Sequence, residues 1–223
     1  MVHRIPCITC PLLRGNWKFG LPMKRPSASP NPPEQPVELR IIGGDFRGRK
    51  LIYSGDLRTR PMKDRVREAV FNLLRKKVEG TYALDLFAGT GALGLEAVSR
   101  GAVGATFIER HFPTAKIIEQ NMELLGIEDC CEVIPGSAFV WSRKMEMPQE
   151  YPWLVFCSPP YAFYQEQTAT MLEFIQRFVD AAPSQSLIVV ESNEEFDTAL
   201  LPQANSWDVR VYPPAVISIL EKA

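Results

Sequence analysis

Apolar positions recur with two different periods along most of this chain. Between residues 82 and 191, short apolar runs bounded by turn residues alternate with segments in which apolar residues return every three or four positions. This alternation is typical of βαβ units and predicts a mainly parallel sheet. We expect strands over residues 82–87, 105–109, 131–134, 153–157 and 187–191, with helices after Gly91, His111 and Tyr164.

The two ends of this pattern differ from its centre. Residues 207–212 and 215–220 flank a Pro-Pro pair with no helix between them, so we expect two antiparallel strands at the end of the sheet. Residues 39–42 and 49–53 flank a glycine-rich turn and predict a short β-hairpin, and a helix follows Pro61. The whole pattern predicts an α/β fold: a seven-stranded, mostly parallel sheet with the last strand antiparallel, plus a small N-terminal hairpin and helix.

The first 38 residues have a different composition from the rest. They carry eight prolines and almost no periodic apolar pattern, which predicts an extended leader without a core of its own. We divide the remaining chain into a basic extension, residues 39–78, and an α/β domain, residues 79–223. The total of 223 residues suits one well-buried core.

Composition excludes several classes of protein. The chain is 46% hydrophobic and 23% charged, as globular proteins are, and no apolar run approaches the roughly 20 residues that cross a bilayer. The cysteine count of five is odd, which indicates reduced thiols and a cytoplasmic location. Cys7 and Cys10 form a lone Cys-x-x-Cys pair without a second pair to complete a zinc site, so we expect no metal.

The net charge of −1 conceals a strongly basic segment. Residues 40–67 hold nine basic and three acidic side chains, whereas residues 145–223 hold eleven acidic and three basic ones. A basic stripe on an otherwise acidic protein is the electrostatic footprint of phosphate contacts. We therefore expect nucleic acid to bind along this stripe, through Arg47, Arg49, Lys50, Arg65 and Arg67.

A glycine motif is the first candidate for chemistry. Residues 84–94 read Leu-Asp-Leu-Phe-Ala-Gly-Thr-Gly-Ala-Leu-Gly, a predicted strand that runs into glycines opening a helix. Glycine is needed where the backbone turns tightly and a ligand approaches closely, and the motif alone fits a dinucleotide as well as S-adenosylmethionine. Asp85 favours the latter, because a carboxylate there can hold the ammonium of the methionine group. Glu109, at the end of the next strand, suits a ribose diol in either ligand.

A second motif, Ser158-Pro159-Pro160-Tyr161, follows an apolar strand. The two prolines lack N–H groups and fix the loop, so that carbonyl groups and the Ser158 hydroxyl can accept from one donor. An exocyclic amino group of a base is such a donor, and acceptors that hold its hydrogens turn its nitrogen toward a methyl donor. Tyr161 offers a face on which a base removed from its stack can rest. Together with the glycine motif, this loop predicts methyl transfer to a base amine.

Three longer segments, residues 40–51, 59–72 and 84–97, resemble the bacterial 16S ribosomal RNA guanine-N2 methyltransferases that modify guanine 966. The similarity extends over roughly residues 39–221, and Arg-Pro-Met-Lys-Asp-Arg-Val-Arg-Glu is its most specific part. The resemblance implies a Rossmann-like class I methyltransferase fold, S-adenosylmethionine as donor, and ribosomal RNA of the small subunit as substrate. We expect a cytoplasmic monomer that needs neither a metal nor a covalent intermediate.

The resemblance also assigns positions to the expected cofactor pocket. These are Arg60, Asp85, Phe87, Gly89, Gly91, Glu109 and Ser137. Asp85 and the glycines would line the methionine end, and Glu109 would hold the ribose. Ser137 stands where an aspartate or asparagine usually meets the adenine amino group, and Arg60 would lie beside both the cofactor and RNA.

Ser158 departs from the family pattern, in which the loop usually begins with aspartate. A hydroxyl can hold an amine, but it cannot act as a carboxylate toward developing positive charge. Ser-Pro-Pro-Tyr also resembles the motif of cytosine-N4 DNA methyltransferases. A DNA cytosine-N4 or adenine-N6 methyltransferase and a noncatalytic RNA-binding assembly factor on the same fold therefore stay open as alternatives. A nicotinamide oxidoreductase would leave this loop without a role.

Overall fold

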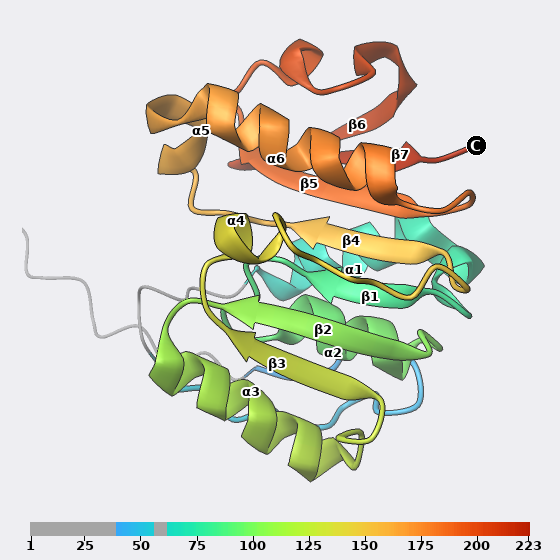
Figure 1. Cartoon of the computed structure of the whole chain (residues 1–223). Coiled ribbons are helices and arrows are strands. Elements are labelled where there is room, and N and C mark those ends of the chain that lie inside the picture. Colours follow the sequence, from blue (N-terminus) through green and yellow to red (C-terminus); the bar gives the residue numbers. More distant parts are fainter. Residues whose placement is uncertain (1–38, 56–61) are drawn as a thin grey trace, which may run out of the picture. The chain divides into compact units, whose positions relative to one another are not determined.

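A seven-stranded sheet with the strand order β3-β2-β1-β4-β5-β7-β6 forms the centre of the fold (Figure 1). The computed structural model describes residues 39–55 and 62–223. The strands are β1 (Tyr82–Asp85), β2 (Gly104–Glu109), β3 (Cys131–Pro135), β4 (Trp153–Cys157), β5 (Leu187–Asn193), β6 (Trp207–Tyr212) and β7 (Ala215–Glu221). β1 to β5 pair in parallel, whereas β7 pairs antiparallel with both β5 and β6. The expected seven-stranded sheet with its antiparallel last strand is confirmed.

Two strand bounds differ from the expected ones by two residues, and three others differ by one residue. β1 ends at Asp85, two residues early, because the chain turns there into the glycine loop. β5 continues to Asn193 because β7 pairs with it along its whole length, from Leu187 opposite Glu221 to Asn193 opposite Ala215. An antiparallel neighbour thus lengthens a strand whose parallel pairing with β4 covers only four positions.

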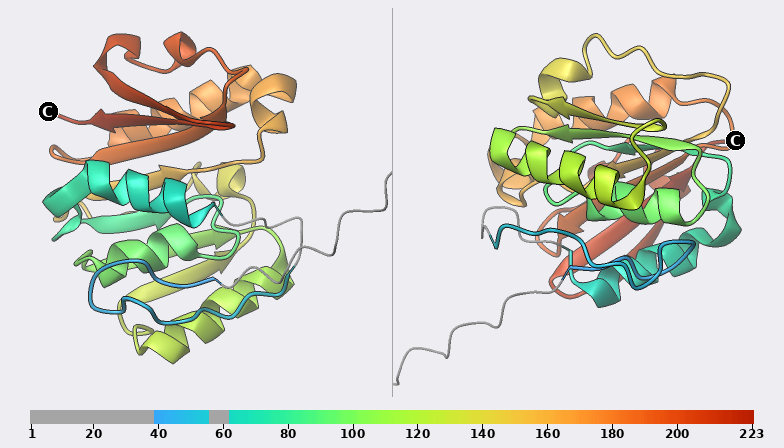
Figure 2. Two further views of the ribbon diagram at one scale, coloured as in Figure 1. Left: turned by 180° about the vertical axis from the view of Figure 1, so that it is seen from behind. Right: turned by 90° about the horizontal axis from the view of Figure 1, so that it is seen from below.

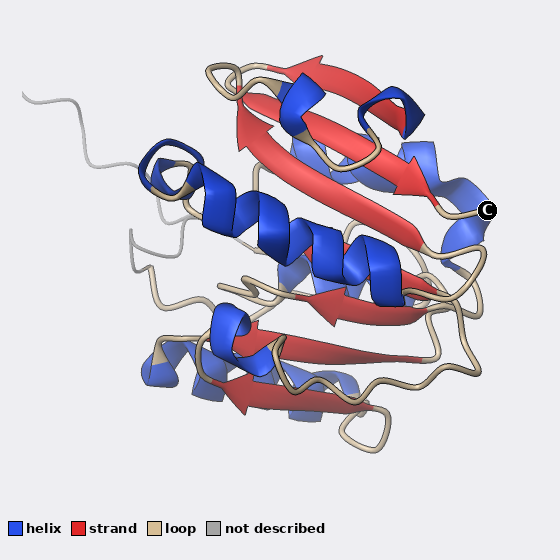
Figure 3. Cartoon of the chain, turned by 45° about the horizontal axis from the view of Figure 1, so that its top comes forward, coloured by secondary structure: helices blue, strands red, loops and turns tan. Residues whose placement is uncertain are grey.

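Helices cover both faces of the sheet (Figures 2 and 3). On one face lie α1 (Asp64–Leu74), α2 (Ala92–Ser99) and α3 (Phe112–Leu125), and on the other lie α4 (Ala138–Trp141), α5 (Ala162–Glu166) and α6 (Thr168–Ala181). Short 3₁₀ helices are η2 (Arg75–Val78), η3 (Thr198–Leu200) and η4 (Ala204–Ser206). Successive residues of β1 face opposite layers, since Ala83 packs with the first set and Leu84 with the second. A sheet covered on both faces requires continuous apolar strands, and all five residues of β4 are buried.

The N-terminal hairpin is shorter than the sequence predicts. Its two arms meet in a single antiparallel bridge between Arg40 and Lys50, supported by a backbone hydrogen bond from Leu51 N–H to the Leu39 carbonyl at 2.8 Å. The expected strands over residues 39–42 and 49–53 are therefore not formed as such. The reason is that backbone N–H groups of the turn bond to α2 instead of continuing the ladder.

Glu96 of α2 is the residue that fastens this hairpin. Its carboxylate is fully buried and accepts from Ile42 N–H and Gly43 N–H, both at 2.7 Å. Arg100 donates to the same carboxylate at 2.7 Å, and Arg67 Nε lies 3.9 Å from it. The apolar hairpin residues share one core cluster with α1, α2 and α3. The hairpin is thus held by a buried charged cluster as well as by apolar packing.

Some expectations concern residues that lie outside the described part of the chain. These are the leader, residues 1–38, with Cys7 and Cys10, and Arg60. The division of the chain at residues 38 and 78 stays a prediction. Among the described residues, no helix combines the length and apolar composition that a membrane span requires.

Candidate active site

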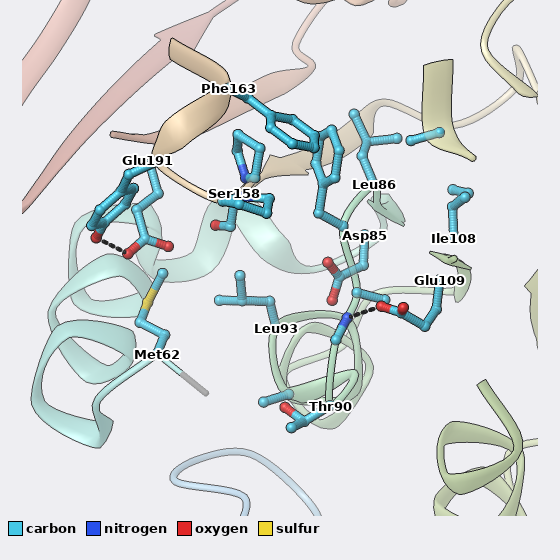
Figure 4. Close-up of a pocket in the computed structure, with 18 of the residues that line it drawn as sticks. Met62, Asp85, Leu86, Thr90, Leu93, Ile108, Glu109, Ser158, Phe163 and Glu191 are labelled. Carbon is cyan, nitrogen blue, oxygen red and sulfur yellow. Dashed lines mark hydrogen bonds between the residues drawn. The ribbon is translucent and has the colours of Figure 1, made fainter. Parts of the chain in front are cut away.

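A cavity of about 660 Å³ opens at the carboxyl ends of the parallel strands (Figure 4). β1 and β4 are neighbours, but the sheet continues from β1 to β2 on one side and from β4 to β5 on the other. Such a switch point in an open α/β sheet leaves a crevice in which ligands bind. Most of the predicted cofactor and catalytic residues line it: Asp85, Phe87, Gly89, Glu109, Ser137, Ser158, Pro159, Pro160 and Tyr161.

The glycine loop joins β1 to α2 at the cavity wall. Gly89 and Gly91 have positive φ angles of 51° and 75°, a conformation that favours glycine. A Cβ at Gly89 would meet nothing closer than the Phe87 carbonyl at 3.9 Å, so the loop leaves open space there. Gly91 is the N-cap of α2 and does not line the cavity. A Cβ at Gly91 would lie 3.1 Å from Cγ2 of Ile118. Gly94 lets α2 approach β2, since a Cβ there would lie 2.4 Å from the Phe107 ring.

Asp85 places a buried carboxylate at the end of β1. The residue is 1% exposed, and its Oδ2 accepts from Gly94 N–H at 3.0 Å, which helps to cap α2. Its Oδ1 has no hydrogen-bond partner among the described residues. The pKa of Asp85 is raised to about 7, mainly by burial. The Gly94 hydrogen bond lowers this pKa, and the charge of Glu109 adds to the rise. A ligand cation beside Oδ1 would compensate this buried charge.

Glu109 ties the glycine loop to the end of β2. Its Oε2 accepts from Gly89 N–H at 2.7 Å, and its Oε1 accepts from His111 N–H at 2.6 Å. Each carboxylate oxygen has a second lone pair, so both can still accept from hydroxyl groups in the cavity. Ser137, the residue before α4, lines the same cavity.

Aromatic rings form one wall of the cavity. Phe87 packs edge-on against Phe139 of α4 and Phe163 of α5, with ring centroids 5.8 and 6.1 Å apart. Phe139 and Phe163 lie 5.9 Å from each other, and all three rings line the cavity. Sequence reasoning found Phe87 but missed the other two. Their positions two residues after Ser137 and Tyr161 were the only signal, because two short helices bring them together.

The Ser-Pro-Pro-Tyr loop continues from β4 into α5 and faces the same space. Figure 4 shows Glu191 and Met62 at one end of the cavity and Glu109 at the other, with Ser158 and Asp85 between them. The Tyr161 hydroxyl donates to Glu191 Oε1 at 2.9 Å. Sequence reasoning missed Glu191, although it ends a predicted strand as Glu109 does.

The basic residues of the predicted stripe divide into two groups. Arg47, Arg49, Lys50 and Arg65 are exposed. Arg67 is fully buried, and its guanidinium donates to the Arg40 carbonyl at 2.6 Å and to Asp64 at 3.0 Å. The expected contact of Arg67 with RNA does not fit this position, because no phosphate can reach a side chain enclosed by the hairpin and α2.

The chain is similar in sequence to several known proteins. The family profile described as Conserved hypothetical protein 95 matches residues 39–211. The ribosomal RNA small subunit methyltransferase D of Escherichia coli (strain K12) is 36% identical over 181 residues, which are 81% of this chain and 85% of that protein. The putative rRNA methyltransferase YlbH of Bacillus subtilis (strain 168) is 29% identical over 159 residues, 71% of this chain and 85% of its own length.

The chain is also similar to solved structures. The putative methyltransferase yhhF from Escherichia coli has a TM-score of 0.67 and 33% sequence identity, over 83% of this chain and 99% of that chain. The region matched by the family profile includes the hairpin, the glycine loop, the Ser-Pro-Pro-Tyr loop and Glu191. The matched region therefore contains the site residues described above.

Proposed function

Because this chain belongs to the family described as Conserved hypothetical protein 95, with relatives named as ribosomal RNA methyltransferases, we propose that it is an S-adenosylmethionine-dependent 16S rRNA methyltransferase. The methyl group goes to the exocyclic N2 of a guanine in the small subunit. The observation that carries the proposal is that the Ser-Pro-Pro-Tyr loop and the glycine loop face one cavity. The enzyme works as a monomer in the cytoplasm.

S-adenosylmethionine fits the charges and space of this cavity. The unpartnered Oδ1 of Asp85 suits the ammonium of its methionine group, and the open space at Gly89 admits the adjoining atoms. The remaining lone pairs of Glu109 suit the two ribose hydroxyls. Ser137 can accept from the adenine amino group, with flat apolar surface from Phe139 beside it. When bound, this cofactor supplies an electrophilic methyl group on a sulfonium.

The residues of the loop after β4 hold the target amine. The Ser158 hydroxyl and the Pro159 carbonyl accept from its two N–H groups, which orients the nitrogen lone pair. Tyr161 supports the face of the flipped base, and its hydroxyl is fixed by Glu191. No group of the protein needs to form a covalent bond with the base, since positioned acceptors suffice for direct transfer.

RNA binding along the hairpin and α1 leads to a prediction about salt dependence. Replacing the exposed Arg49 and Arg65 together with alanine is expected to weaken binding to naked 16S RNA and to lower the slope of log K against log salt by about one per lost phosphate contact. Fluorescence anisotropy at several salt concentrations measures both quantities. Arg177→Ala is the matched control, because Arg177 is exposed on α6, over the opposite face of the sheet. Equal slopes for the double variant and the control would contradict this placement of the RNA.

Methyl transfer to three substrates tests the proposed function itself. Labelled S-adenosylmethionine is incubated with small ribosomal subunits from a strain lacking the enzyme, with naked 16S RNA and with duplex DNA, and the product nucleoside is identified by mass spectrometry. N2-methylguanosine in RNA is the expected product, with Ser158→Ala slower by about tenfold or more, because one group that positions the amine is lost.

The same assay separates the alternatives. Label in cytosine or adenine of duplex DNA would show a DNA methyltransferase and refute the proposal. Cofactor binding without transfer to any substrate would favour a noncatalytic RNA-binding assembly factor, because Ser158 lacks the charge of a carboxylate.

A further inference from the structure

Glu191 reaches the cavity from β5, but the loop chemistry so far uses it only as a support for Tyr161 (Figure 4). The Tyr161 hydroxyl donates to its Oε1 at 2.9 Å, and the Ser158 side chain lies near enough to the carboxyl to lower its pKa. The two side chains that bind the target base therefore both lie beside one acid.

This end of the cavity is rich in acceptors. Each carboxylate oxygen has two lone pairs, so Glu191 keeps acceptor capacity beyond the bond from Tyr161. The Ser158 hydroxyl oxygen adds its own lone pairs to the same cavity. Burial raises the pKa of the Glu191 carboxyl, and the hydrogen bond from Tyr161 offsets part of this rise.

The bases differ in the protonation of the ring nitrogen next to the exocyclic amine. Guanine carries a ring N1–H next to its N2 amino group, so two donors point in the same direction. Adenine and cytosine carry an unprotonated ring nitrogen, an acceptor, in that place. A carboxylate can accept two parallel N–H bonds, whereas it repels a lone pair. A site built from buried hydrogen-bonding groups rejects a ligand that leaves them unpaired.

We propose that Glu191 selects guanine, by accepting a hydrogen bond from the ring N1–H and, together with the Pro159 carbonyl, one from an N2 hydrogen while Ser158 holds the other. This assignment rests on the proposed function, because it takes guanine N2 as the methyl acceptor. It adds that the enzyme recognises guanine by its ring N1–H. It also adds that a carboxylate from β5 supplies the charge that the Ser-Pro-Pro-Tyr loop lacks.

The test compares guanine with 2-aminopurine at the methylated position. 2-Aminopurine keeps the 2-amino group but has an unprotonated N1. We place it in 16S RNA by ligation, at the guanine that the wild-type enzyme methylates, and reconstitute the particle. The wild type is expected to prefer guanine at least about tenfold in affinity and in rate, the effect of one charged hydrogen bond. Glu191→Gln is expected to abolish or reverse this preference, because the glutamine amide can donate to the unprotonated N1 of 2-aminopurine while accepting from the amine.

A readout without the methyl donor accompanies the rates. The fluorescence of 2-aminopurine rises when the base leaves its stack, and titration with the protein gives the affinity directly. Competition by the guanine particle gives the second affinity. Glu191→Asp, which keeps the carboxylate, is expected to retain the preference for guanine at a lower rate. Binding of S-adenosylmethionine, measured by calorimetry, shows that each variant is folded.

Tyr161→Phe is the matched control for a purely structural role. It removes the hydroxyl that donates to Glu191 but keeps the ring. We therefore expect it to weaken the binding of both particles by a similar factor and to leave the ratio of the two affinities unchanged. An unchanged ratio in Glu191→Gln, with wild-type methylation of guanine intact, would overturn the role of Glu191 and leave the proposed function standing. Wild-type methylation of adenine or cytosine, or of no RNA, would overturn both.

Discussion

Glu96→Ala is expected to lower the free energy of unfolding by about 3–5 kcal/mol, because removal of one partner from a buried charged cluster leaves the others unpaired. The buried Arg67 would keep Asp64 as a carboxylate partner but lose Glu96, and the N–H groups of Ile42 and Gly43 would lose their acceptor. The hairpin has only one bridge of its own and would detach from α2.

Urea unfolding followed by circular dichroism measures this effect. Glu68→Ala on α1 is the matched control, since Glu68 is exposed, and a change within about 0.5 kcal/mol is expected for it. Glu96→Gln should fall between the two, because its amide oxygen keeps one acceptor. A loss of less than about 1 kcal/mol in Glu96→Ala would mean that apolar packing alone holds the hairpin.

Asp85→Asn is expected to weaken S-adenosylmethionine binding by about 10- to 100-fold while stabilising the ligand-free protein. The asparagine oxygen can keep the bond from Gly94 N–H, but it cannot compensate an ammonium. The ionised carboxylate is unfavourable in the folded state, where its pKa is raised from 3.8 to about 7. This cost is absent below pH 4 and complete above pH 7, where it reaches at most about 4 kcal/mol.

Two measurements check both parts of this prediction. Calorimetric titration at pH 8 gives the affinity, and unfolding at several pH values gives the stability of the variant relative to the wild type. The difference in unfolding free energy should be near zero at pH 4 and should grow in favour of Asp85→Asn as the pH rises to 7. A difference in stability that does not depend on pH would show that the fold does not raise the pKa of Asp85. An unchanged affinity for S-adenosylmethionine would show that Asp85 does not bind the cofactor.

The local pattern of apolar and polar residues predicted most of the fold and several residues of the site. The strand and helix periods are properties of neighbouring residues, so the parallel sheet and its antiparallel end could be inferred from sequence. Asp85, Glu109 and Ser158 each follow or end an apolar strand, and the carboxyl ends of parallel strands meet at one edge of the sheet. Their meeting in one cavity therefore needed no knowledge of side-chain contacts.

Pairing between distant residues lay outside the reach of sequence. The basic stripe looked uniform, yet Arg67 is buried because Glu96, on the next helix, holds the hairpin over it. Phe139 and Phe163 form one wall only because α4 and α5 meet on the same face of the sheet. The hairpin arms are joined by backbone hydrogen bonds but form no regular strands, because the turn bonds to α2.

The sequence by itself determined the α/β fold, the glycine loop, the Ser-Pro-Pro-Tyr loop and the basic segment, because each depends on residues close together in the chain. Only the tertiary structure decided which arginines face solvent and which carboxylate stands beside Ser158. Glu191 lies 33 positions beyond Ser158 in sequence, and the pairing of β4 with β5 brings the two together. The partner of a polar side chain is set by the packing of whole elements, which no local pattern encodes.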